Sequence, residues 1–130
     1  MAHPVSVTLD VEDLRPSHDL PERAVLMTHR VLDLFAEAGV RASVYVVADL
    51  AERRPELVRR AADDGHEVGL HGHEHVPLPI VGADRFGAVT RDARALLQDL
   101  SGQSVEGYRA PMMSLVPASK WAVPILADLG

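Results

Sequence analysis

Two short stretches of the chain hold the side-chain types that could do chemistry. Residues 70–75 read Leu-His-Gly-His-Glu-His, and four of the seven histidines fall between His66 and His75. Residues 8–13 read Thr-Leu-Asp-Val-Glu-Asp and place three acids within four positions. Imidazoles and carboxylates are the usual protein ligands of a catalytic divalent metal. Because the chain has no cysteine, any metal site in it would be built from histidines and carboxylates.

The spacing of His71 and His75 suits a shared metal ion. They lie four positions apart, and Gly72 allows a close approach of the backbone. On a helical turn or in a tight loop, both imidazoles can therefore point at one ion. The same spacing also fits a polar surface loop whose histidines hydrogen-bond to water. His73 would project to the other side and is the weaker candidate, whereas His66, which starts a predicted strand, is expected to be structural.

The three acids offer one general base and one metal ligand, with one acid to spare. They are Asp10, Glu12 and Asp13. They also fit the N-terminus of a helix, where the helix dipole favours acids. An aspartate buried at a strand end is costly unless it is paired or bound to a metal. Arg109, which follows another predicted strand, could supply the cation, although that arginine by itself fits a surface salt bridge better.

The elements that must position these residues alternate between strand and helix. β-Favouring runs predict strands at residues 4–9, 42–47, 66–70 and 105–108. Helical spacing of apolar residues, with Asp19 as the N-cap of the first helix, predicts helices at residues 20–38, 48–51, 55–63, 84–100 and 120–129. Such alternation implies an α/β fold with a parallel sheet and right-handed crossovers. Chemistry collects at the carboxyl ends of the strands in such folds, and Asp10, His71 and Arg109 all lie at predicted strand ends.

Length and composition narrow the class of protein. The chain has 130 residues, 47% of them hydrophobic and 4% aromatic, which suits one domain with a core of Leu, Val and Ala. The nearly continuous apolar run at 42–47 predicts a strand covered on both faces. No apolar run approaches the ~18 residues of a membrane span, and no signal peptide is visible, so we expect a cytoplasmic protein. The net charge of −6 argues against a nucleic-acid partner.

Together these motifs resemble a known family. The acidic motif, His-x-x-x-His at 71–75 and Arg-x-Pro at 109–111 occur in the order found in the polysaccharide deacetylases of carbohydrate esterase family four, the NodB-like family. The connecting segments Pro-Glu-Leu-Val at 55–58 and Gly-His-Glu-Val-Gly at 65–69 are similar too. The Asp-Val-Glu-Asp form resembles the branch of that family nearer its cytoplasmic or inner-membrane-associated members. The resemblance covers nearly the whole chain.

The resemblance implies a fold and a metal. The fold would be a distorted (β/α) barrel, to which residues 1–130 would contribute a parallel β-α repeat that lacks the last strands. His71 and His75 would hold a divalent metal, usually zinc and sometimes cobalt, nickel or manganese. Family members more commonly carry two adjacent aspartates, a pattern that this chain lacks. The carboxylate ligand would therefore be Glu12 or Asp13, and Glu12 is preferred by position.

The resemblance also implies a reaction. Asp10 would be the base that takes a proton from metal-activated water, and Arg109 would pair with Asp10 and keep it ionised. The backbone N–H of Met112 would help to stabilise the oxyanion. The substrate would be an acetylated carbohydrate, which yields acetate and a free amine. A small cyclic amide, opened as in allantoinase-like relatives, is the alternative substrate.

A last expectation concerns completeness. The family takes its general acid from a late histidine, and no candidate for it occurs between Arg109 and Gly130. The chain would then belong to a longer protein, or be completed by a second copy, or act as a metal-binding module without turnover. An unclosed parallel sheet leaves exposed edges, so self-association is also expected.

Overall fold

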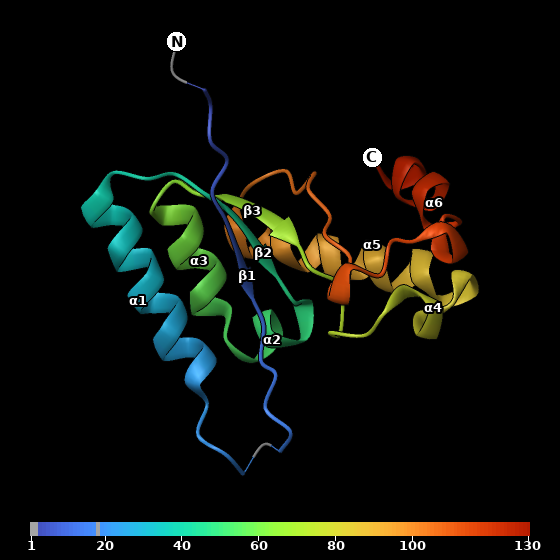
Figure 1. Ribbon diagram of the computed structural model, residues 1–130, viewed down its shortest axis with the longest axis horizontal. Coiled ribbons are helices and arrows are strands. Elements are labelled where there is room, and N and C mark those ends of the chain that lie inside the picture. Colours follow the sequence, from blue (N-terminus) through green and yellow to red (C-terminus); the bar gives the residue numbers. More distant parts are fainter. Residues whose placement is uncertain (1–2, 18) are drawn as a thin grey trace.

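The computed structural model describes residues 3–17 and 19–130 (Figure 1). These residues form a parallel three-stranded sheet in the order β1-β2-β3. The strands are β1 (Thr8–Val11), β2 (Ser43–Val46) and β3 (Glu67–Leu70). The helices are α1 (Arg23–Ala38), α2 (Ala48–Arg53), α3 (Pro55–Asp63), α4 (Leu78–Val81), α5 (Ala83–Ser101) and α6 (Ala122–Leu129). Two 3-10 turns, Pro111–Met113 and Pro117–Ser119, precede α6. The predicted α/β class with a parallel sheet is confirmed.

One face of the sheet is buried under helices. Strand side chains alternate between the two faces, and Val44 and Val46 of β2 are buried on the same face. Figure 1 shows α1, α3 and α5 lying alongside the strands. Each of these helices places apolar side chains from one stripe in the same hydrophobic cluster, including Leu32, Val58 and Leu97. This cluster holds the strands in register and thereby fixes where their carboxyl ends lie.

The opposite face of the sheet carries the polar side chains. Asp10, Tyr45 and Gly69 face one another across the three strands. Tyr45 is only half-buried, so the prediction that β2 is covered on both faces is wrong for the described residues. A Cβ atom at Gly69 would lie 2.6 Å from carbon atoms of the Tyr45 ring. The ring therefore lies across β3, and the absence of a side chain at Gly69 makes room for it.

Most predicted helices are confirmed, with small changes at their ends. Helix α1 begins three residues later than predicted and has Glu22, not Asp19, as its N-cap, whereas Gly39 ends it in a left-handed conformation with φ 65°. Helix α4, which follows Pro77 and includes Pro79, lies in a segment where no helix was predicted. Both prolines lie at its start, where a missing N–H costs nothing.

Among the described residues, no helix has both the length and the apolar character needed to cross a bilayer.

The first strand is shorter than predicted and lies later in the sequence. It was predicted at residues 4–9, but β1 spans Thr8–Val11 and so includes Asp10. The cause lies in its neighbour, because a strand exists only where it has a partner. Strand β2 begins at Ser43, which is opposite Thr8, so the β-favouring residues before Thr8 have little to pair with.

The prediction of a fourth strand at residues 105–108 is wrong, because no such strand forms in the described part of the chain. Only one bridge forms, between Leu70 and Tyr108. The side chain of Gln103 occupies the edge of β3 instead. Its Oε1 accepts from the Val68 N–H at 3.0 Å, and its Nε2 donates to the His66 carbonyl at 2.8 Å. A side chain thus satisfies the backbone groups that another strand would pair with.

We therefore predict that Gln103→Leu destabilises the protein by about 1–3 kcal/mol, because it leaves the N–H of the fully buried Val68 unpaired. Denaturant unfolding measures the change. Ser104→Ala is the control, since Ser104 is exposed and bonds to the side chain of Glu106 at 3.3 Å, and its effect should stay within about 0.5 kcal/mol. An unchanged free energy of unfolding in Gln103→Leu would show that the two hydrogen bonds of the Gln103 side chain to β3 do not contribute to stability.

Candidate active site

Strand alternation sorts the three acids of the 8–13 motif onto different faces. Val11 is 2% exposed and points into the core. Because side chains alternate with a period of two, Asp10 and Glu12 both point away from that core, and Asp13 points to the other side. The first two acids line one cavity together with His71 and His75.

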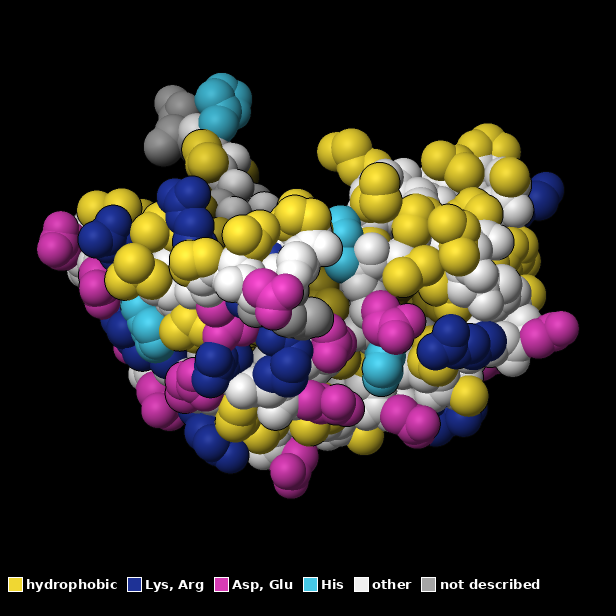
Figure 2. Space-filling model, turned by 90° about the horizontal axis from the view of Figure 1, so that it is seen from below, with side chains coloured by type: hydrophobic (Ala, Val, Ile, Leu, Met, Phe, Trp, Pro, Cys, Tyr) yellow, Lys and Arg dark blue, Asp and Glu magenta, His cyan; other side chains and the backbone are white. Residues whose placement is uncertain are grey.

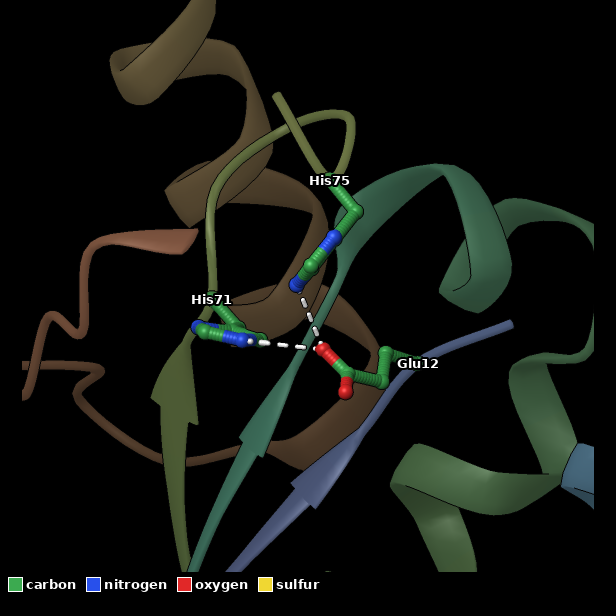
Figure 3. A group of neighbouring side chains, drawn as sticks. All are labelled: Glu12, His71 and His75. Atoms are coloured by element: carbon green, nitrogen blue, oxygen red, sulfur yellow. Dashed lines mark hydrogen bonds and ion pairs between the residues drawn. The ribbon is translucent and has the colours of Figure 1, made fainter. Parts of the chain in front are cut away.

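Glu12 meets both of the predicted metal-binding histidines. Its Oε2 atom lies 3.2 Å from Nε2 of His71 and 2.6 Å from Nε2 of His75 (Figure 3). The glutamate follows β1, and the two histidines follow β3, so three side chains from opposite edges of the sheet converge above its carboxyl end. One ligand atom from each lies within 4.8 Å of the others, a geometry that can hold a metal ion.

The hydrogen bonding of His71 supports this fit. Its ring is buried, and Nδ1 lies 2.9 Å from the backbone oxygen of Arg109. A carbonyl oxygen only accepts, so Nδ1 carries a hydrogen, and Nε2 is the ring atom that faces Glu12. A lone pair that faces a carboxylate needs a proton or a metal cation between the two. Two imidazoles and one carboxylate are also a ligand set suited to zinc and similar divalent ions.

Gly72 lets the histidine loop turn back on itself. Its φ is 79°, in the left-handed region. A Cβ atom there would lie 2.8 Å from Cγ of Pro111 and 3.0 Å from the backbone oxygen of Glu74. The residue that follows His71 therefore has to be glycine, in line with the close backbone approach expected there from the sequence.

Asp10 has a different partner from Glu12. Its Oδ1 lies 2.5 Å from a guanidinium nitrogen of Arg109, and its Oδ2 lies 3.8 Å from Nε2 of His71. The same guanidinium group stacks over the Tyr45 ring, 4.2 Å from the ring centre. Asp10 is thus held beside the histidine cluster and is oriented by an arginine. Tyr45 was missed in the sequence, although strand alternation puts it on the same face as Asp10.

Asp13 is engaged elsewhere. Its side chain is 6% exposed and accepts from Nε of Arg15 at 2.9 Å and from a terminal nitrogen of the same arginine at 2.7 Å. The hydrogen bonds from Arg15 hold the pKa of the Asp13 carboxyl below its ordinary value. The geometry therefore favours Glu12 over Asp13 as the carboxylate that faces the histidines.

The cavity above the strand ends has about 860 Å³ and one apolar wall. Met112, Met113 and Leu115 form that wall. Met112 and Met113 have φ values of 55° and 53°, a conformation that costs non-glycine residues about 1–2 kcal/mol each. Figure 2 shows the molecule from below: charged side chains of both signs interleave over the left and lower part of this face, and hydrophobic ones gather most densely at its upper right.

The remaining histidines of the 66–75 stretch lie where the sequence placed them. His66 is buried at the start of β3, where its Nδ1 accepts from the Ala42 N–H at 3.1 Å. His73 lines a separate small cavity on the other side of the loop. Neither ring lines the cavity of Asp10 and Glu12.

Comparison with known proteins identifies the family. Residues 4–130 match the family model described as polysaccharide deacetylase. The chain belongs to the polysaccharide deacetylase family.

Curated relatives of this deacetylase-family chain come from several bacteria. It is 28% identical over 96 residues to a peptidoglycan-N-acetylglucosamine deacetylase of Bacillus cereus, a match that covers 73% of this chain and 35% of the relative. It is 37% identical over 87 residues to a chitooligosaccharide deacetylase of Sinorhizobium fredii, covering 66% and 40%. The chain thus spans well under half the length of either relative.

Solved structures confirm the fold of the family. A putative polysaccharide deacetylase from Mycobacterium smegmatis has a TM-score of 0.76 at 28% identity, with 96% of this chain and 48% of that chain covered. A CE4 family pseudoenzyme from Bacillus anthracis has a TM-score of 0.75 at 15% identity, with 95% and 39% covered. The second likeness shows the fold alone.

We predict that this deacetylase-family chain binds a divalent metal through His71 and His75. The double variant His71→Ala/His75→Ala should lose the metal, because only a carboxylate would remain in the cluster. Elemental analysis after dialysis against Zn²⁺ measures the content. His73→Ala is the matched control, since its ring lies outside the cavity, and it should keep the wild-type content. Equal metal in wild type and double variant would refute the assignment.

Proposed function

We propose that this chain carries the metal and base residues of a hydrolase that removes N-acetyl groups from a carbohydrate. The observation that carries the proposal is the pair of neighbouring carboxylates with different partners. Glu12 faces His71 and His75, whereas Asp10 is held by Arg109 beside them. One carboxylate is thus placed to bind a metal, and the other is free to exchange a proton.

In this proposal the ligands are His71, His75 and Glu12. A divalent ion held there supplies Lewis acidity, which acidifies water and polarises an amide carbonyl. Zinc suits two imidazoles and one carboxylate, and cobalt, nickel and manganese suit them as well. The Nδ1 hydrogen bond of His71 to a backbone carbonyl fixes its ring with Nε2 directed to the metal position.

Asp10 acts as the general base in the proposed reaction. It accepts the proton of the attacking water, and Arg109 holds the carboxylate in one orientation while it does so. The N–H of Met112 contributes a donor to the oxyanion that forms on the acetyl carbonyl. The strained backbone at that residue supports this role, because such strain persists where the surrounding structure holds it and clusters at active sites.

The names of the relatives support an acetylated amino sugar as the substrate. They act, by name, on peptidoglycan N-acetylglucosamine and on chitooligosaccharides, and the open cavity of about 860 Å³ leaves room for a sugar. Acetate release from acetylated chitooligosaccharides and from peptidoglycan fragments tests this substrate class. Ring opening of a cyclic amide such as allantoin, without acetate release, would replace it with the second candidate.

Replacing the base should separate catalysis from metal binding. Asp10→Asn is expected to keep its metal and to lose hydrolysis by ~100-fold or more, as expected when a positioned base is removed. Acetate release and elemental analysis are measured on the same preparation. Asp63→Asn makes the same chemical change on an exposed residue at the end of α3 and should alter neither. Loss of metal in Asp10→Asn would make Asp10 a ligand instead.

A further inference from the structure

Asp13 is the acid of the 8–13 motif that the proposed reaction leaves without a role. It is nonetheless the most deeply held of the three acids, with its side chain 6% exposed. Arg15 binds both of its oxygens, and a guanidinium nitrogen of Arg53 lies 3.7 Å from Oδ2. Glu22 lies 3.0 Å from Arg53 and 3.4 Å from Arg15. We call these four residues the Asp13 network.

The network ties the turn after β1 to helix α2. Arg53 is the last residue of α2. At the other end of this six-residue helix, the first two backbone amides donate to the carbonyl oxygens of Gly72 and His73, at 3.0 and 2.8 Å. One short helix therefore holds the histidine loop by its first turn and the glutamate-bearing turn by its last residue.

We propose that Asp13 is a positioning residue for the metal site: through Arg15 and Arg53 it fixes the turn that carries Glu12 to the same helix that fixes His71 and His75. The distance between the glutamate and the histidines is then set before a metal binds. This inference rests on the proposed function, because it takes Glu12, His71 and His75 to be the metal ligands. Groups that orient a metal ligand through a direct hydrogen bond change metal affinity by 10–100-fold when they are lost. The Asp13 network acts on Glu12 through the backbone of the turn, so we expect an effect near the lower end of that range.

Variants of Arg15 and Arg53 distinguish a positioning role of the network from a purely electrostatic effect on metal binding. If nearby charge alone mattered, removing the positive charge of Arg15 or Arg53 would strengthen the binding of a divalent cation. If Asp13 were itself a ligand, removing its arginines would free it and also strengthen binding. Positioning predicts the opposite sign, because the turn that carries Glu12 loses its anchor.

The experiment compares Zn²⁺ and Co²⁺ affinities by titration calorimetry, at a temperature well below unfolding. Arg15→Gln and Arg53→Gln should each bind Zn²⁺ ~10-fold or more weakly than wild type. The visible spectrum of the Co²⁺-loaded protein, which reports coordination geometry, should change in the same variants. Arg60→Gln is the matched control, because Arg60 on α3 bridges Asp33 and Asp64 in a similar way. It should leave both readouts at wild-type values.

Two further measurements test the positioning role of Asp13 independently. The double variant Asp13→Asn/Arg15→Gln should bind Zn²⁺ no more weakly than the worse single variant, since both act through one network. In the metal-free protein, the amides of residues 12–14 should exchange hydrogen faster in Arg15→Gln than in wild type, which tests the anchor even if binding is too weak to titrate. Wild-type affinity and exchange in both arginine variants would overturn the positioning role alone. No metal uptake by wild type would overturn the proposed function with it.

Discussion

The contact of one carboxylate with two imidazoles is the interaction on which the site depends, and the fold is what makes it reachable. Glu12 and the histidines follow β1 and β3, which are separated by β2. Strands in a sheet are about 4.8 Å apart, so the two outer strands are about 10 Å apart. The long glutamate side chain from one edge and a loop curling back from the other span that gap. An aspartate at position 12 would be one methylene shorter.

Three acids lie within four residues, and each has a different kind of partner. Glu12 faces imidazoles, Asp10 faces an arginine at the cavity wall, and Asp13 lies under two arginines away from the cavity. The surroundings thus give three carboxylates different partners. In the proposed reaction these partners decide their roles, which are proton transfer for Asp10, metal binding for Glu12 and anchoring of the turn for Asp13. Strand alternation separates the roles, since it places the first two acids on one face and Asp13 on the other.

Much of the site could be predicted from the sequence, because the relevant signals are local. The β-α alternation predicts Asp10 and His71 together at the carboxyl end of a parallel sheet, and the spacing of His71 and His75 suggests a shared metal ion. Arg109 lies at the same end although the strand predicted before it does not form. The missing fourth strand could not be predicted in this way, since its place is taken by a glutamine side chain whose two contacts depend on three-dimensional packing. The start of β1 depends in the same way on where its partner strand begins. The preference for Glu12 over Asp13, by contrast, follows from alternation once Asp10 is placed on the cavity face.

Likeness of fold carries only part of the functional argument. A CE4 family pseudoenzyme has a backbone similar to that of this chain, so the backbone alone does not decide whether a member of the family is active. The polar face of the sheet is where such proteins can differ. Here the Tyr45 ring needs a neighbour without a side chain at Gly69 and supports Arg109, which in turn orients Asp10. A glycine with no reactive group of its own therefore helps to keep the Arg109–Asp10 pair in place, because a Cβ atom there would displace the Tyr45 ring that supports the arginine.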